Sequence, residues 1–195
     1  MGNVVSKTIS FLTNPMFVSA YVFTYVVLLH EGLNGLLKIA IAILSTCILP
    51  AGYIIMLKLR GLVTDFYVSR REDRFRPFLV GLIGYTINLA SLVLLKAHIK
   101  VQLLALCYVV NTLFSMLITF KWKISVHLAG IAGPLTYLVL VYGTSPLILI
   151  MAVIIVSWAR IADGAHTLSQ TIAGGLSAFT LTYLQVVLFK CFKLI

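Results

Sequence analysis

The sequence predicts an all-α membrane protein, a polytopic bundle of six or seven transmembrane helices that forms one domain over residues 1–195. Of the 195 residues, 61% are hydrophobic and only 10% are charged, whereas soluble domains are about 45–50% apolar and about 25% charged. The mean hydropathy is +1.08, and the apolar residues occur in long runs between short polar segments. A soluble fold of this size would lack the polar groups needed to cover its surface. We therefore expect a multi-pass protein of the cell membrane and exclude soluble enzymes and secreted disulfide scaffolds.

The apolar runs define the expected helices in chain order. A helix needs about 17–25 apolar residues to cross about 30 Å of hydrocarbon. The shortest candidate is 147–159, and if the first run does not cross, the count falls from seven to six. Residues 4–13 are expected to lie on the membrane surface as an amphipathic segment. The seven candidate spans are 15–30, 33–57, 78–96, 101–120, 126–142, 147–159 and 171–189.

Three polar segments, 61–77, 121–127 and 160–170, are each separated from the next by two candidate spans. Helices that cross in alternating directions return the chain to the same side after every second span. We therefore expect these three segments to emerge on one side of the membrane, and the short turn at 96–100 on the other.

The formal net charge is +10, from 15 Lys and Arg against 5 Asp and Glu. Nucleic-acid binding is not expected, because no basic stripe with interleaved aromatic residues occurs on a soluble face. The basic residues stand at the ends of the apolar runs instead. This leaves two interpretations: orientation signals that follow the positive-inside rule, or a site for an anion.

The segment 160–170 carries the candidate residues Arg160, Asp163 and His166 where two apolar helices meet. A charged residue inside a membrane costs about 2.5–3.5 kcal/mol on insertion scales, so such residues suggest function. The alternative is a solvated loop with incidental polar residues. A second histidine, His127, stands at the start of another span on the same expected side, next to Ser125. Two histidines with arginines suit an anionic substrate that is attacked by a nucleophile and assisted by a general acid.

The segment 69–77 contains four arginines, which can bind phosphate oxygens in a bidentate manner. Its alternative interpretation is a positive-inside anchor. Metal binding is not expected, because the aspartates Asp65, Asp73 and Asp163 are isolated and the three cysteines are far apart. The lack of paired aspartates also argues against an intramembrane prenyltransferase or an alcohol phosphatidyltransferase, which hold Mg²⁺ on such pairs. The arginines of the segment are Arg70, Arg71, Arg74 and Arg76.

In this order, the three segments resemble the motifs of the type 2 phosphatidic acid phosphatase superfamily, K-x6-R-P, P-S-G-H and S-R-x5-H-x3-D. The resemblance covers roughly residues 69–185. Five positions depart from the family pattern: Ser69 stands at the lysine, Ile124 at the proline, Val126 at the glycine, Ala159 at the serine and Gln170 at the aspartate. The matching residues are Arg76 and Pro77, then Ser125 and His127, then Arg160 and His166, with Arg70 or Arg71 near the place of the lysine.

The resemblance implies a metal-independent phosphatase that needs no cofactor and acts on a lipid phosphate, a polyprenyl diphosphate or a phosphatidate- or phosphatidylglycerophosphate-type lipid. His166 would be the nucleophile and form a phosphohistidine, His127 would be the general acid, and Gln170 would orient His166. Two alternatives remain, a non-catalytic member that keeps the fold and a small membrane transporter, although no repeat between the halves of the chain supports the second. The expected phosphate ligands are Arg70, Arg71, Arg76, Ser125 and Arg160.

Overall fold

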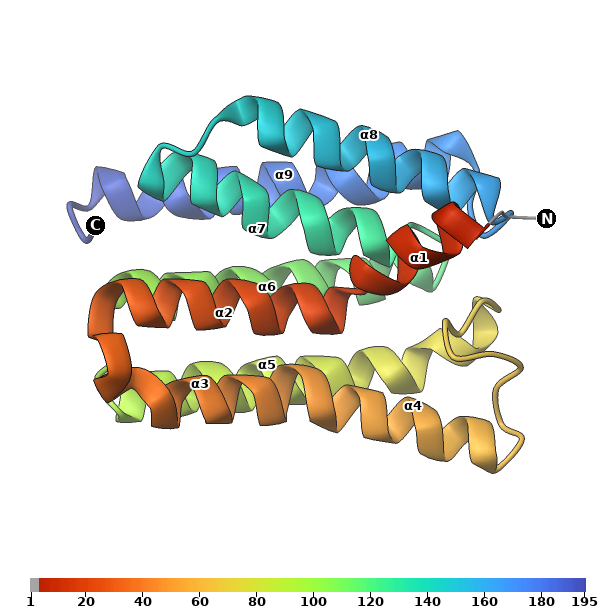
Figure 1. Cartoon of the computed structure of the whole chain (residues 1–195), viewed down its shortest axis with the longest axis horizontal. Helices are drawn as coiled ribbons and strands as arrows, with labels where there is room; N and C mark the ends of the chain where they lie inside the picture. Colours follow the sequence, from red (N-terminus) through yellow and green to blue (C-terminus); the bar gives the residue numbers. More distant parts are fainter. Residues whose placement is uncertain (1–3) are drawn as a thin grey trace. The chain divides into compact units, whose positions relative to one another are not determined.

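The computed structural model describes residues 4–195, and within this range the chain consists of helices and turns with no strand (Figure 1). The prediction of an all-α protein is confirmed. A 3₁₀ turn, Gly32–Gly35, separates α2 from α3, a π turn, Leu44–Ile48, lies between α3 and α4, and a second 3₁₀ turn, Glu72–Arg74, precedes α5. The helices are α1 (Val4–Leu12), α2 (Pro15–Glu31), α3 (Leu36–Ile43), α4 (Leu49–Leu59), α5 (Phe75–Leu94), α6 (Ile99–Thr119), α7 (Val126–Tyr142), α8 (Pro146–Ala162) and α9 (Leu168–Cys191).

Each expected apolar run coincides with a helical segment to within a few residues. Within residues 4–195, four stretches are long and apolar enough to cross a membrane, as expected of an integral membrane protein: Pro15–Leu59, Glu72–Leu94, Ile99–Thr119 and Leu168–Cys191. The helices α7 and α8 are equally apolar in character but have 17 residues each. The count of six or seven spans stays a prediction.

The chain divides into two compact units. The terminal unit comprises the chain up to Val18 together with Ile124–Ile195, and the central unit comprises Ser19–Lys123. The expectation of one domain over the whole chain stays a prediction, and each unit is described by itself.

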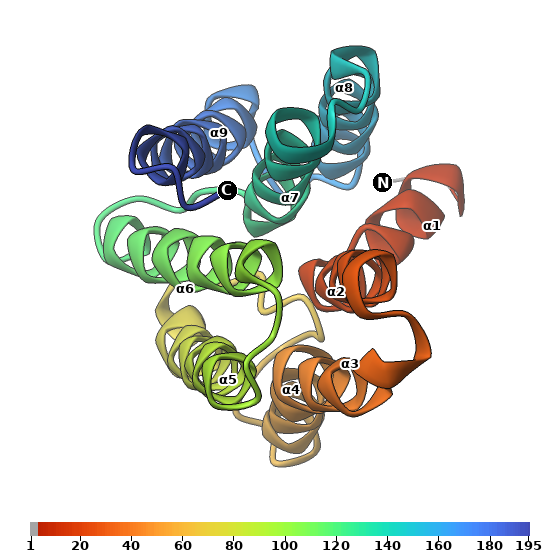
Figure 2. The same ribbon diagram turned by 90° about the vertical axis from the view of Figure 1, so that its left-hand side faces the viewer.

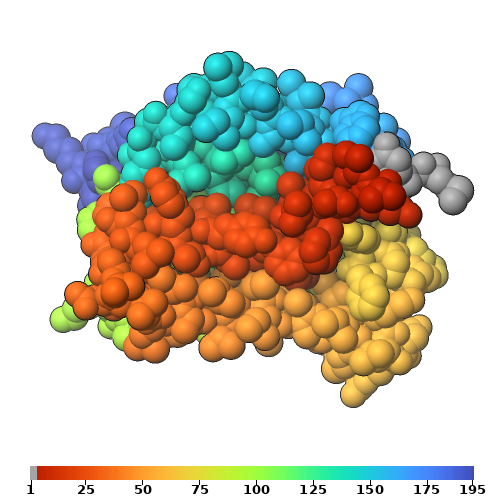
Figure 3. All heavy atoms as spheres, viewed as in Figure 1, coloured from red at the N-terminus to blue at the C-terminus, as the bar shows by residue number. Residues whose placement is uncertain are grey.

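In the terminal unit, α7 lies between α8 and α9, as the view along the helices shows (Figure 2). Small side chains allow this close approach, because Ala129 and Ala132 of α7 pack with Ala178 of α9. The first helix, α1, packs along α8, and the space-filling view shows its outer side chains at the surface (Figure 3). The terminal unit thus places α1 against α8, the helix that carries Arg160.

In the central unit, α5 lies between α4 and α6 (Figure 2). Gly84 of α5 sits directly against the backbone carbonyl of Ser45 in the π turn, where any Cβ would collide with that oxygen. The long connection between α4 and α5 holds the arginine-rich segment at one end of this unit. This connection is the only extended non-helical segment of the central unit.

Candidate functional site

A backbone hydrogen bond joins the second and third sequence segments in the terminal unit. The N–H of Ser125, the N-cap of α7, donates to the carbonyl oxygen of Gln170 in the first turn of α9 at 3.0 Å. Gly174, one turn further along α9, lies so close to Ser125 that an added Cβ would overlap the Ser125 carbonyl oxygen. The beginnings of α7 and α9 are therefore held together, and with them the residues around His127 and His166.

His166 lies in the turn between α8 and α9, and its side chain is buried. Its Nδ1 atom is 3.1 Å from Oε1 of Gln170. The same Oε1 accepts the backbone N–H of Thr167 at 3.3 Å, as part of a capping box at the start of α9. Because a backbone N–H can only donate, this contact identifies the amide atom as the oxygen. Nδ1 of His166 must then donate, and the lone pair of the neutral imidazole is on Nε2.

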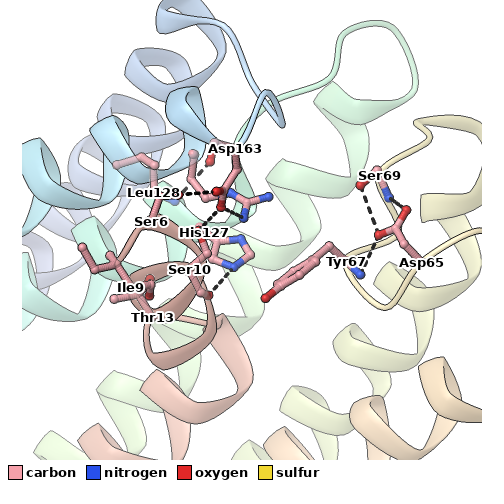
Figure 4. Close-up of polar contacts among 12 residues, drawn as sticks. Ser6, Ile9, Ser10, Thr13, Asp65, Tyr67, Ser69, His127, Leu128 and Asp163 are labelled. Atoms are coloured by element: carbon pink, nitrogen blue, oxygen red, sulfur yellow. Dashed lines mark hydrogen bonds and ion pairs between the residues drawn. The ribbon is translucent and has the colours of Figure 1, made fainter. Parts of the chain in front are cut away.

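Arg160 lies in the last turn of α8 and is one of the few buried charged side chains, with 3% of its surface exposed. Its Nη1 atom is 3.7 Å from Oδ2 of Asp163 one turn later. The two carboxylate oxygens of Asp163 accept the hydroxyl groups of Ser6 at 2.6 Å and Ser10 at 2.7 Å (Figure 4). The carboxylate thus has a donor on each oxygen and faces the guanidinium of Arg160 as a fixed negative charge.

His127 occupies the second position of α7 and is also buried. Its Nε2 atom lies 3.1 Å from the backbone carbonyl oxygen of Ser10 (Figure 4). A carbonyl oxygen only accepts, so Nε2 carries a proton. The same carbonyl can stabilise the imidazolium form, in which Nδ1 carries the second proton.

Sequence reasoning missed the contribution of α1. Ser6 and Ser10 stand one helical turn apart on the same face of the segment 4–13. This spacing is the feature of the sequence that could have indicated a polar contact made by α1. Nothing local indicates that this face turns inward, toward Asp163, rather than toward water. The structure therefore adds Ser6 and Ser10 to the candidate site, as the partners of Asp163.

The arginines of the first segment belong to the central unit, where Arg70, Arg71 and Arg76 are all exposed. The Arg71 guanidinium donates to the carbonyl of Lys121 at 2.7 Å, which links the arginine-rich segment to the end of α6. Arg70 stands 3.9 Å from Asp73 in an exposed ion pair. Because these arginines lie in the other compact unit, their joining His166 around a phosphate stays a prediction.

The connection before α5 is built around Asp65, which the sequence analysis treated as isolated. Its carboxylate accepts the backbone N–H groups of Tyr67 at 2.8 Å and Ser69 at 3.2 Å (Figure 4). Burial opposes its ionisation, but these hydrogen bonds, with those from the Ser69 and Thr64 hydroxyls, outweigh it and hold the pKa of Asp65 below its usual value. The turn places Val68 at a φ of +49°, a strained conformation for a β-branched residue.

Arg74 fastens this turn from the other side. Its side chain is buried, and its Nε–H donates to the carbonyl of Val68 at 2.9 Å. Of the four arginines in the segment, Arg74 is thus the one with a buried structural role. The segment is an ordered, hydrogen-bonded loop rather than a loose string of positive charges.

The groups that the structure brings together are two imidazoles, a buried guanidinium and a carboxylate that is occupied by hydroxyl donors. Among the described residues, 4–195, no group of three His, Cys, Asp or Glu side chains is arranged to hold a metal ion. Comparison of the chain with known protein families, with curated proteins and with solved structures found no match.

Proposed function

We propose that this protein is a multi-pass membrane phosphatase of lipid phosphates, with a polyprenyl diphosphate or a phosphatidate- or phosphatidylglycerophosphate-type lipid as its substrate. The observation that carries the proposal is the contact of His166 with Gln170. It keeps a proton on Nδ1 and the lone pair on Nε2, which is the state a nucleophilic imidazole requires. The resemblance of the three sequence segments to the phosphatase motifs supports the same role.

The proposed reaction has two steps. In the first, Nε2 of His166 forms a bond to phosphorus while the bond from phosphorus to the leaving oxygen breaks. The imidazolium of His127 gives that oxygen its proton. In the second step, His127 takes a proton from water, the water oxygen bonds to phosphorus, and the phosphorus–nitrogen bond breaks to release phosphate and restore His166.

Positive charge is the other requirement, because a phosphoryl group in transfer carries its charge on oxygens that the protein must hold. Arg160 supplies a buried guanidinium whose orientation is supported by Asp163. Ser125 accepts the N–H of Leu128 through its hydroxyl oxygen at 3.4 Å, so its hydroxyl proton can be donated to a phosphate oxygen. The proposal adds Arg70, Arg71 and Arg76 as further phosphate ligands, on the basis of sequence order and charge.

One observation favours a second candidate, a non-catalytic protein that binds lipid phosphates. Gln170 has no negative charge with which to stabilise a charged His166, and its side-chain oxygen already serves the cap of α9. A structural role in the cap accounts for this residue without any reaction. Binding of a lipid phosphate without phosphate release is the result that this candidate predicts.

Phosphate release by the purified protein in lipid nanodiscs tests the proposal. The substrates are a polyprenyl diphosphate, phosphatidate and phosphatidylglycerophosphate, each in excess EDTA. We expect release that persists in EDTA and disappears in His166→Ala, while the matched variant His98→Asn keeps it, since His98 caps α6 in the central unit and asparagine is also a good N-cap. Labelled substrate should leave an acid-labile phosphoryl group on the wild-type protein. Release that requires added Mg²⁺, or that survives in His166→Ala, would contradict the mechanism.

A further inference from the structure

The polarity of α1 is the reverse of that of a surface helix on a soluble protein. Its buried residues are Ser6 and Ser10, and its exposed residues are mostly large and apolar. On an α-helix, successive residues are rotated by about 100°, which places the two serines together and the apolar side chains on the opposite side. The exposed apolar side chains are Val4 (81% exposed), Val5 (57%), Phe11 (55%) and Leu12 (53%).

The inward face of α1 holds three atoms of the candidate site. The hydroxyls of Ser6 and Ser10 donate to the two carboxylate oxygens of Asp163, and the backbone carbonyl of Ser10 contacts Nε2 of His127. Asp163 in turn faces the guanidinium of Arg160. One helix therefore contacts both the proposed general acid and, through one carboxylate, the proposed phosphate ligand.

The inward face of α1 has its partners within the protein, so the environment to be identified is that of the outer, apolar face, and lipid suits it. Four large apolar side chains directed away from the protein are stable in the acyl-chain boundary and unfavourable in water. The exposed Lys7 lies at the edge of this apolar face, where a long cationic side chain can reach lipid headgroups. Figure 3 shows α1 laid along the surface of the terminal unit with its outer side uncovered.

We propose that α1 lies in the membrane–water interface with its apolar face in lipid, and that its inward serines position Arg160 and His127 for the phosphate. The second half rests on the proposed function, whereas the first half does not. Ser6 and Ser10 act as positioning residues, because they reach Arg160 through Asp163. Lipid therefore acts on the site indirectly, because it holds in place the helix that orients these groups.

The location of α1 is tested with nitroxide labels on single cysteines in nanodiscs, in a background where Cys47, Cys107 and Cys191 are alanine. Labels at Val5→Cys and Leu12→Cys are compared with one at Phe66→Cys, an exposed position in the connection before α5. We expect the two α1 labels to collide more with dissolved oxygen than with a water-soluble nickel chelate, and the Phe66 label to show the opposite. Equal access of the nickel chelate to all three labels would overturn the proposal, whatever the activity.

The positioning role is tested with the double variant Ser6→Ala/Ser10→Ala and the matched control Thr8→Ala, whose hydroxyl bonds only to the carbonyl of Val4 within α1. We expect the double variant to raise KM, and the dissociation constant of inorganic phosphate, by roughly tenfold or more, because each lost hydrogen bond is made to a charged group. Thr8→Ala should change neither, and Ser6→Thr/Ser10→Thr should restore much of the affinity.

The two proposals fail separately. A wild-type protein that releases no phosphate from any substrate defeats the proposed function, while the label measurement still decides where α1 lies. An active wild type whose phosphate affinity is unchanged in Ser6→Ala/Ser10→Ala overturns the positioning role and leaves the proposed function standing.

Discussion

The backbone N–H of Ser125 donates to the carbonyl oxygen of Gln170 at 3.0 Å, and this bond couples the N-terminus of α7 to that of α9. Both ends carry orphan backbone donors that need partners, and both are capped, by Ser125 itself and by Thr167. His127, the second residue of α7, and His166, which precedes the N-cap Thr167 of α9, are therefore positioned by the same local structure. Disturbing the contact between the two helix ends should disturb both imidazoles.

Gly174→Ala is expected to disrupt this arrangement strongly. Its new methyl group would collide with the backbone carbonyl of Ser125, and a backbone atom cannot move aside as a flexible side chain can. The neighbouring variant Gly175→Ala is the matched control, because its methyl group would meet only the Cβ of Leu128 at an ordinary 3.9 Å. Overpacking of this kind costs about 1–3 kcal/mol.

The measurement is thermal unfolding in nanodiscs together with phosphate release. We expect Gly174→Ala to lower Tm and activity together and Gly175→Ala to leave Tm unchanged or raise it slightly, since alanine favours a helix. Equal behaviour of the two variants would show that the close approach of Ser125 to α9 is not required.

The positions of the helices could be predicted from the sequence because the signal is local. An apolar run of sufficient length, bounded by residues such as Pro15 or the Gly143–Pro146 turn, becomes a helix whatever its neighbours are. The spacing of His166 and Gln170 is equally local, because His166 lies in the turn just ahead of the N-cap Thr167 and Gln170 lies in the first turn of α9. The structure shows the expected side-chain contact between them at 3.1 Å.

The contacts of Asp163 could not be predicted in the same way. Ser6 is separated from Asp163 by 157 residues along the chain, and two serines carry no pattern that distinguishes an inward face from an outward one. The role of Arg74 was also hidden, because which of four nearby arginines becomes buried depends on the turn at Val68. The combination of the central-unit arginines with His166 is a prediction that activity measurements must test.

Variants of Gln170 should separate its orienting role from a purely structural one. Gln170→Leu removes the acceptor that keeps the proton on Nδ1 of His166, so we expect activity to fall. Gln170→Asp keeps an acceptor and adds a negative charge beside the imidazole, so activity should be preserved or raised. The readout is kcat for phosphate release, with thermal unfolding to correct for loss of the α9 cap. An inactive Gln170→Asp that folds normally would argue against His166 as the nucleophile.

The Asp65 turn should be sensitive to acid. The pKa of this carboxyl is lowered in the folded loop from its ordinary value of 3.8, so its contribution is present above that value and is lost as the pH falls through the lower folded pKa. We expect the amide protons of Tyr67 and Ser69 to be protected from exchange near neutral pH and to lose protection in this acid range. Asp65→Ala should remove the protection at every pH. Protection that persists in Asp65→Ala would mean that Arg74 alone holds the turn.

The leaving group should decide how much His127 matters. His127 donates through Nε2 to the Ser10 carbonyl, so its imidazolium form offers the Nδ1 proton to the leaving oxygen. An alkyl monoester leaves poorly without that proton, whereas a diphosphate leaves as a stabilised phosphate. We therefore expect His127→Ala to lower kcat on phosphatidate by about 10²–10⁴-fold, the usual contribution of general acid catalysis, and to spare the polyprenyl diphosphate by comparison. The alkaline limb of the pH profile of kcat/KM should disappear in the same variant, because that limb reports the loss of the general acid's proton. Equal losses on both substrates with an unchanged pH profile would assign His127 a structural role, as the residue that ties α7 to α1.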